Sequence, residues 1–110
     1  MIIGAGAVAH VAAHKAAQHN DILGDIVIAS RTPAKADKII ESVRRKGNLK
    51  DPSKRIYSRA IDAMDVSATA NLIEDTKSEI VINLGTAYLN MSILEACLKT
   101  GAVYMDTAIH

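Results

Sequence analysis

Glycines and small residues near the start of the chain have the spacing of a phosphate-binding bend. Gly4 and Gly6 are separated by one residue, and Ala9 occupies the place of a third glycine. Gly4 can adopt the angles of a sharp turn, a missing side chain at Gly6 lets a pyrophosphate approach the main chain, and a small Ala9 lets helix and strand pack closely. Backbone N–H groups at the start of the following helix, at Ala7 and Val8, would face the phosphates.

A second candidate group, Ser30, Arg31 and Thr32, follows the apolar segment 25–30. A dinucleotide fold that prefers NAD usually has Asp or Glu about 20 residues after the glycines, to hold the ribose 2′-hydroxyl. A carboxylate would repel a 2′-phosphate, whereas a guanidinium pairs with it bidentately and hydroxyls donate to it. The turn predicts that the chain binds NADP(H) in preference to NAD(H), and that Lys35 makes a weaker second contact with the 2′-phosphate. The alternative is an ordinary strand-to-helix turn in which Thr32 caps the helix.

The remaining candidates follow other predicted strands at their carboxyl ends, where ligands bind in doubly wound sheets. After strand 56–61, the carboxylate of Asp62 or a main-chain group beside it can accept a hydrogen bond from the adenine amino group of the cofactor. A purely structural role of Asp62 in the turn explains this residue equally well. Small residues after strand 79–84 leave room for a nicotinamide. The predicted cofactor contacts in these segments are Asp62, Ala63, Asn83, Leu84, Gly85, Thr86 and Asp106.

Two histidines and the single cysteine are the residues of this sequence that could carry other chemistry. His10 and His14 are one helical turn apart and could hold a metal, but no Glu lies between them and no third ligand is evident. His10 and His14 are therefore expected to pack against neighbouring residues or to face solvent, and no metal site is predicted. The lone Cys97 has no activating base nearby in the sequence, which favours a packed core thiol over a nucleophile.

Hydrophobic periodicity predicts the elements that position these residues. Four helices are expected: one over 7–19 with Val8 and Val11 in its buried stripe, one over 33–46, one capped by Asp65, and one capped by Asn90 and ended by Gly101. The last is expected to bury Ile93, Leu94, Cys97 and Leu98. Strands are expected at 1–3, 25–30, 56–61, 79–84 and 103–105.

This alternation predicts an α/β fold: a doubly wound parallel sheet of the Rossmann type, in the strand order 3-2-1-4-5. A length of 110 residues allows one domain, small for a complete two-substrate enzyme, so a module or fragment is expected. The chain has no Trp or Phe, which leaves an aliphatic core. A net charge of +1 is too small to attract nucleic acid or a membrane surface electrostatically. No apolar segment has the length of a membrane span. The single cysteine agrees with a cytoplasmic setting.

The sequence resembles the amino-terminal domain of the saccharopine dehydrogenase-like reductases. The resemblance rests on segments 4–9, 11–18 and 28–32, and segments 48–52, 81–83, 90–92 and 104–110 narrow it to the carboxynorspermidine (carboxyspermidine) dehydrogenases. It covers essentially the whole chain. Ala9 departs from the glycine that this family usually has at that place, and its methyl group should tighten the bend without abolishing phosphate binding.

The resemblance implies an enzyme of polyamine biosynthesis. Such enzymes condense aspartate β-semialdehyde with a diamine and reduce the imine with NADPH, and they place catalytic and substrate groups mostly in a second domain. We therefore expect residues 1–110 to be the NADP(H)-binding domain, with the catalytic residues outside it, in a cytoplasmic protein that forms a homodimer at full length. Two alternatives stay open: a related reductase such as saccharopine dehydrogenase or homospermidine synthase, and a non-catalytic dinucleotide-sensing module.

Overall fold

A five-stranded parallel sheet organises the computed structural model, which describes residues 1–107. Its order is β3-β2-β1-β4-β5, and every neighbouring pair is parallel. The predicted α/β class and strand order are confirmed. The strands are β1 (Ile2–Ile3), β2 (Ile26–Ser30), β3 (Ile56–Ala60), β4 (Ile80–Asn83) and β5 (Val103–Asp106).

The central strand β1 has only two residues, yet it pairs on both sides. Ile2 is in register with Ile28 and Ile82, and both residues of the strand are buried. The amino group of Met1 extends this pairing by donating to the carbonyl of Ile80 at 2.8 Å, and burial lowers the pKa of that amine to about 6. A short apolar strand suffices here because neighbours cover both of its edges.

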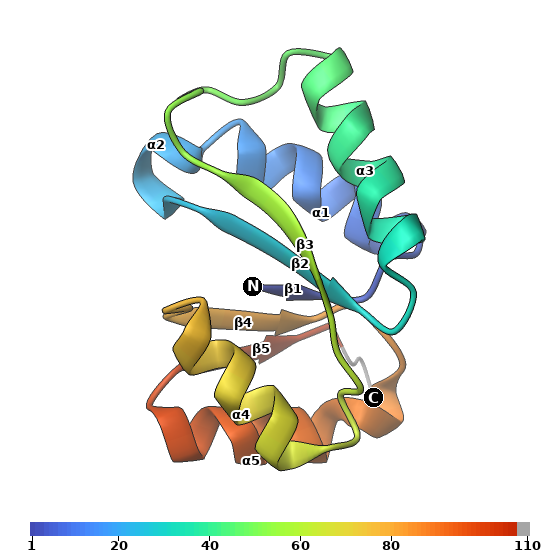
Figure 1. The fold of residues 1–110 in the computed structure, drawn as a ribbon, viewed down its shortest axis with the longest axis vertical. Helices are drawn as coiled ribbons and strands as arrows, with labels where there is room; N and C mark the ends of the chain where they lie inside the picture. The colour runs from blue at the N-terminus through green and yellow to red at the C-terminus, as the bar shows by residue number, and fades with distance from the viewer. Residues whose placement is uncertain (108–110) are drawn as a thin grey trace.

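Helices cover both faces of the sheet (Figure 1). α1 (Ala7–Ala17), α2 (Asn20–Leu23) and α3 (Pro33–Arg45) lie on one side, and α4 (Val66–Asp75) and α5 (Asn90–Thr100) lie on the other. A 3-10 turn, η1 (Ala87–Leu89), leads into α5. No helix in the described part of the chain is long and apolar enough to cross a membrane.

The short helix α2 was not predicted. It begins at Asn20, which is fully buried and exchanges two hydrogen bonds with the main chain of Asp51, at 2.8 and 2.7 Å. The sequence favours a helix end here, because Asn and Asp are more favourable in turns and caps than within a helix. The long-range contact with Asp51 stabilises the extra turn, and no local pattern reveals that contact.

The buried face of α1 differs from the prediction. Val8 and Val11 are 57% and 62% exposed, whereas the residues with no exposed surface are Ala9, Ala13 and Ala17. Because alanine has the smallest side chain able to face a sheet, this stripe brings α1 close to β1 and β2 and turns the larger valines outward. The predicted role of Ala9, close packing of helix on strand, agrees with its complete burial.

Two predictions for α5 were wrong. Leu98 is 75% exposed, and Ala96 is buried beside Cys97 in its place. Asn90 does not cap the helix: it lies within α5, and its side-chain carbonyl accepts from Asn83. Cys97 is a packed core thiol as predicted, and burial raises its pKa. Gly101 ends the helix with a left-handed φ of 80°.

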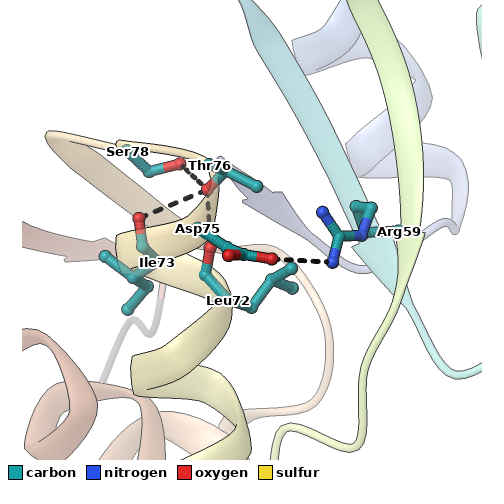
Figure 2. Close-up of polar contacts among 6 residues, drawn as sticks. All are labelled: Arg59, Leu72, Ile73, Asp75, Thr76 and Ser78. Atoms are coloured by element: carbon teal, nitrogen blue, oxygen red, sulfur yellow. Dashed lines mark hydrogen bonds and ion pairs between the residues drawn. The ribbon is translucent and has the colours of Figure 1, made fainter.

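The α4 helix has well-defined ends. Asp65 caps its start, as predicted, by accepting from the N–H of Ala68 at 3.0 Å. At its other end the Thr76 hydroxyl lies 2.8 Å from the carbonyl oxygen of Leu72, and Arg59 of β3 pairs with Asp75 at 3.2 Å (Figure 2). This ion pair is exposed, so it contributes at most about 1 kcal/mol to stability.

His14 connects α1 to α3 and to the loop after α3. Its Nε2 lies 3.1 Å from the Ser42 hydroxyl, and its Nδ1 lies 2.6 Å from the side-chain nitrogen of Asn48. An amide nitrogen only donates, so Nδ1 accepts and the ring is neutral. Burial, together with His10 and Lys46, lowers the pKa of His14. Within residues 1–107 no group of three potential metal ligands includes these histidines.

The chain should lose stability in mild acid through His14. Because the folded-state pKa lies below 6.5, the unfolded chain takes up the proton first, and the contribution of this network is complete above pH 6.5 and decreases below it. Urea unfolding at pH 7.5 and 5.5 measures the effect. His14→Gln should reduce the pH dependence, and the exposed control His19→Gln should not. An equal pH dependence in wild type and His14→Gln would contradict the prediction.

Candidate functional site

The loops after β1, β2, β3 and β4 meet at the carboxyl edge of the sheet and enclose a pocket of about 290 Å³. We call it the edge pocket. It brings together predicted residues from all four loops and adds several apolar ones. Its lining is Ile3, Gly4, Ser30, Arg31, Ile61, Asp62, Ala63, Met64, Gly85, Thr86, Tyr88 and Leu89.

The bend between β1 and α1 needs glycine at its first position. Gly4 has a φ of 116°, and a Cβ built on it would lie 2.8 Å from the main-chain nitrogen of Gly85. Both the backbone angle and the space therefore exclude a side chain. The N–H of Gly4 donates to the carbonyl of Ala29 at 2.9 Å, which ties the bend to β2.

Gly6 leaves open space in front of the start of α1. It occupies the N-cap position, no side chain caps the helix, and a Cβ added to it would meet nothing within 4 Å. The first N–H groups of a helix have no partner within the helix. An anionic group can therefore approach the N–H groups of Ala7 and Val8, and this open cradle fits the diphosphate of a dinucleotide.

The bend also borders a wide groove between α1 and α3, which we call the α1/α3 groove. Ala5, Gly6 and Ala7 line its end, and Lys35, Lys38 and Arg45 add positive charge along α3. Lys35 therefore lies beside the bend but does not line the edge pocket. Its predicted role as a secondary phosphate contact stays a prediction.

The turn after β2 presents an available guanidinium. The Ser30 hydroxyl accepts from the N–H of Thr32 at 3.1 Å, which shapes the turn, and Pro33 begins α3. Thr32 stands at the N-cap position, but its side chain makes no capping hydrogen bond. Arg31 is exposed and makes no ion pair with any residue in 1–107. The structure thus leaves the Arg31 charge free for a ligand.

The loop after β3 forms one wall of the edge pocket. The Asp62 carboxylate accepts from the N–H of Met64 at 3.1 Å, so it has the turn role that was the alternative to adenine binding. Ala63 is buried, and its carbonyl accepts from the Ser92 hydroxyl at 2.9 Å. Asp62 still lines the pocket, which leaves the adenine contact as a prediction.

The loop after β4 is held by a buried amide. Asn83 is 3% exposed, and its side-chain nitrogen donates to Asn90 Oδ1 at 2.6 Å and to the carbonyl of Thr86 at 3.2 Å. Its side-chain oxygen accepts from the N–H of Gly85 at 2.9 Å. Asn83 and Leu84 do not line the edge pocket, whereas Gly85 and Thr86 do. The Asn83 side chain therefore stabilises the conformation of the loop after β4.

Sequence reasoning missed the apolar walls of the edge pocket. Tyr88 and Met64 are 70% and 48% exposed near Leu89 and Ile61. They lie in irregular segments or a 3-10 turn, where periodicity carries no signal. The sequence offered one indication, a tyrosine placed shortly after a strand, because loops at such positions carry binding residues.

Asp106 ends β5 at the same edge, outside the lining of the edge pocket. It accepts a hydrogen bond from the Tyr104 hydroxyl at 2.7 Å. Burial and this carboxylate raise the pKa of Tyr104, so the phenol stays protonated. The last residues of the motif that carried the resemblance, 108–110, lie outside the described residues.

Comparisons with known proteins agree with this geometry. The family model "Saccharopine dehydrogenase NADP binding domain" matches residues 1–110. Carboxynorspermidine synthases of Vibrio alginolyticus and Vibrio cholerae are 52% and 50% identical over 97% of this chain, and carboxyaminopropylagmatine dehydrogenase of a Synechocystis species is 39% identical over 98%. The chain spans about a quarter of the length of these relatives, 26%, 26% and 25% respectively.

A solved structure supports the fold independently. Saccharopine dehydrogenase (L-Glu forming) from Saccharomyces cerevisiae superposes with a TM-score of 0.73 at 18% identity, over 99% of this chain and 21% of that one. At this identity the likeness concerns the fold alone.

Two glycine substitutions should separate folding from phosphate binding. Gly4→Ala forces a side chain into a positive φ and against Gly85, which should cost at least about 2 kcal/mol of unfolding free energy. Gly6→Ala has room for its methyl group and should cost less than about 1 kcal/mol, yet that methyl group would occupy the open cradle and weaken NADPH binding at least tenfold. Urea unfolding and calorimetry measure the two effects. A Gly6→Ala variant with wild-type NADPH affinity would contradict this account of the bend.

Proposed function

The chain belongs to the family of saccharopine dehydrogenase NADP binding domains, and from this membership we propose that it is the cofactor domain of an imine-reducing oxidoreductase. The reaction is the reduction, by NADPH, of the imine formed from aspartate semialdehyde and a diamine. The names of the two Vibrio relatives, carboxynorspermidine synthases at 52% and 50% identity, support this choice. The substrate and catalytic groups would belong to the remainder of a longer polypeptide, which would act as a homodimer in the cytoplasm.

One structural observation carries the proposal: an open helix start and an available arginine lie at neighbouring strand ends. The N–H groups of Ala7 and Val8 would hold the diphosphate, and Arg31 would pair with the 2′-phosphate. The edge pocket would take the adenosine, with Tyr88 and Met64 as apolar walls. When bound, NADPH supplies the hydride, and this domain supplies orientation and charge.

A related reductase is the second candidate. Carboxyaminopropylagmatine dehydrogenase is 39% identical over nearly the whole chain. Its cofactor domain would be built in the same way, and the two candidates would differ in the amine that they use. The substrate, and not the cofactor, therefore distinguishes them.

Arg31→Ala should remove the preference for NADPH. A bidentate charged contact is worth about 1.5–3 kcal/mol, so NADPH should bind roughly 10- to 150-fold more weakly while NADH binding changes little. Calorimetric titration of both cofactors measures this difference. Arg55→Ala is the matched control, because Arg55 lies at the amino end of β3, where it pairs with Asp25. Equal wild-type affinity for NADPH and NADH would contradict the role given to Arg31.

Residues 1–110 should bind NADPH but catalyse no imine reduction, because the catalytic groups are proposed to lie in the remainder of a longer polypeptide. Absorbance at the NADPH band, followed with aspartate semialdehyde and 1,3-diaminopropane or putrescine, checks this outcome, and the longer parent polypeptide should oxidise NADPH in the same assay. Sustained oxidation by residues 1–110 alone would place catalysis in this domain. No oxidation by the parent would favour the related reductase or a dinucleotide sensor.

A further inference from the structure

The first turn of α5 contacts two of the four loops that enclose the edge pocket, those after β3 and β4. Asn90 accepts from Asn83, which holds the loop after β4, and Ser92 donates to the carbonyl of Ala63 in the loop after β3. The contacts measure 2.6 and 2.9 Å. Both come from one helical turn, so the two loops share a single support.

That support is itself fixed in the core. Ile93 lies between Ser92 and the rest of α5 and has no exposed surface, and Ala96 is likewise fully buried. The Ser92 hydroxyl also lies 3.1 Å from the carbonyl of Leu89, directly before the helix. A displacement of this turn would therefore have to disturb the packed core.

Both loops contribute residues to the lining of the pocket. The loop after β3 contributes Ala63 and Met64, and the loop after β4 contributes Gly85 and Tyr88. None of Asn83, Asn90 and Ser92 lines the pocket. Any influence that these three residues have on a ligand must act through the loops.

We propose that Asn83, Asn90 and Ser92 are positioning residues that set the separation of the two loops, and thereby the affinity for the adenosine half of the cofactor. The inference rests on the proposed NADP(H) site. Loss of either contact lets one wall move, and ordering that wall again opposes binding. Loss of the Asn90 contact should have the larger effect on stability, since it leaves the buried Asn83 amide nitrogen with only the carbonyl of Thr86 as an acceptor.

Ser92 offers a test with a matched control on the same helix. Thr100 has a comparable hydroxyl at the far end of α5, bonded to the carbonyls of Ala96 and Cys97 and remote from the edge pocket. Ser92→Ala and Thr100→Val each remove one helix-bonded hydroxyl. Only Ser92→Ala also frees the loop after β3.

The experiment is calorimetric titration of the 110-residue chain with NADPH and with 2′,5′-ADP, beside urea unfolding of each variant. Ser92→Ala and Asn90→Ala should weaken both ligands about 3- to 10-fold, as expected for one lost hydrogen bond. Thr100→Val should bind both as wild type does, and Ser92→Thr should restore affinity.

Unchanged affinity in Ser92→Ala, or an equal loss in Thr100→Val, would overturn the inference while leaving the proposed function in place. A wild-type chain that binds neither NADPH nor 2′,5′-ADP would overturn both. A loss of NADPH affinity in Ser92→Ala without a loss for 2′,5′-ADP would also contradict it, because the adenosine half is the part that the two loops are proposed to hold.

Discussion

The main-chain contact between Gly4 and the Leu84–Gly85 peptide is the constraint on which the edge of the sheet depends. A Cβ on Gly4 would lie 2.8 Å from the Gly85 nitrogen, and the N–H of Leu84 donates to the carbonyl of Ile3 at 2.8 Å. The loops after β1 and β4 can therefore touch only where a side chain is missing. This contact turns the chain toward α1 and leaves the start of that helix open at Gly6.

Charge is distributed unevenly around this edge. The whole chain has a net charge of +1, but six cationic and two anionic residues fall between positions 31 and 46, so the remainder is net negative. The excess positive charge lies on α3 and the turn before it: Arg31 and Lys35 are at the end of α3 near the bend, and Arg44, Arg45 and Lys46 are at the other end. Net charge alone gave no indication of an anionic ligand, whereas its local distribution agrees with a phosphate-bearing cofactor.

The fold could be predicted because its strong signals are local. Apolar strand segments, Asp65 as a cap and Gly101 as a stop each depend on a few neighbouring residues, and the strand order follows from βαβ topology. The failures involve tertiary contacts that no periodic pattern reveals: Asn20 with Asp51 across 31 positions, Asn83 with Asn90 across one irregular loop, and the alanine stripe of α1 against the sheet. In the candidate site, Gly4 and Arg31 were identified from their types, but Tyr88 and Met64 were missed because loop packing has no periodic pattern.

We propose that the open start of α1 and the turn at Arg31 receive the diphosphate and the 2′-phosphate of one NADP(H) molecule. The most direct measurement is an NMR titration of the isotopically labelled chain with NADPH, following backbone amide signals. We expect the largest shifts at Gly6, Ala7 and Val8 together with Arg31, and smaller shifts along the edge pocket. Shifts confined to the amino edge of the sheet, or to the far end of the α1/α3 groove near Arg45, would contradict it.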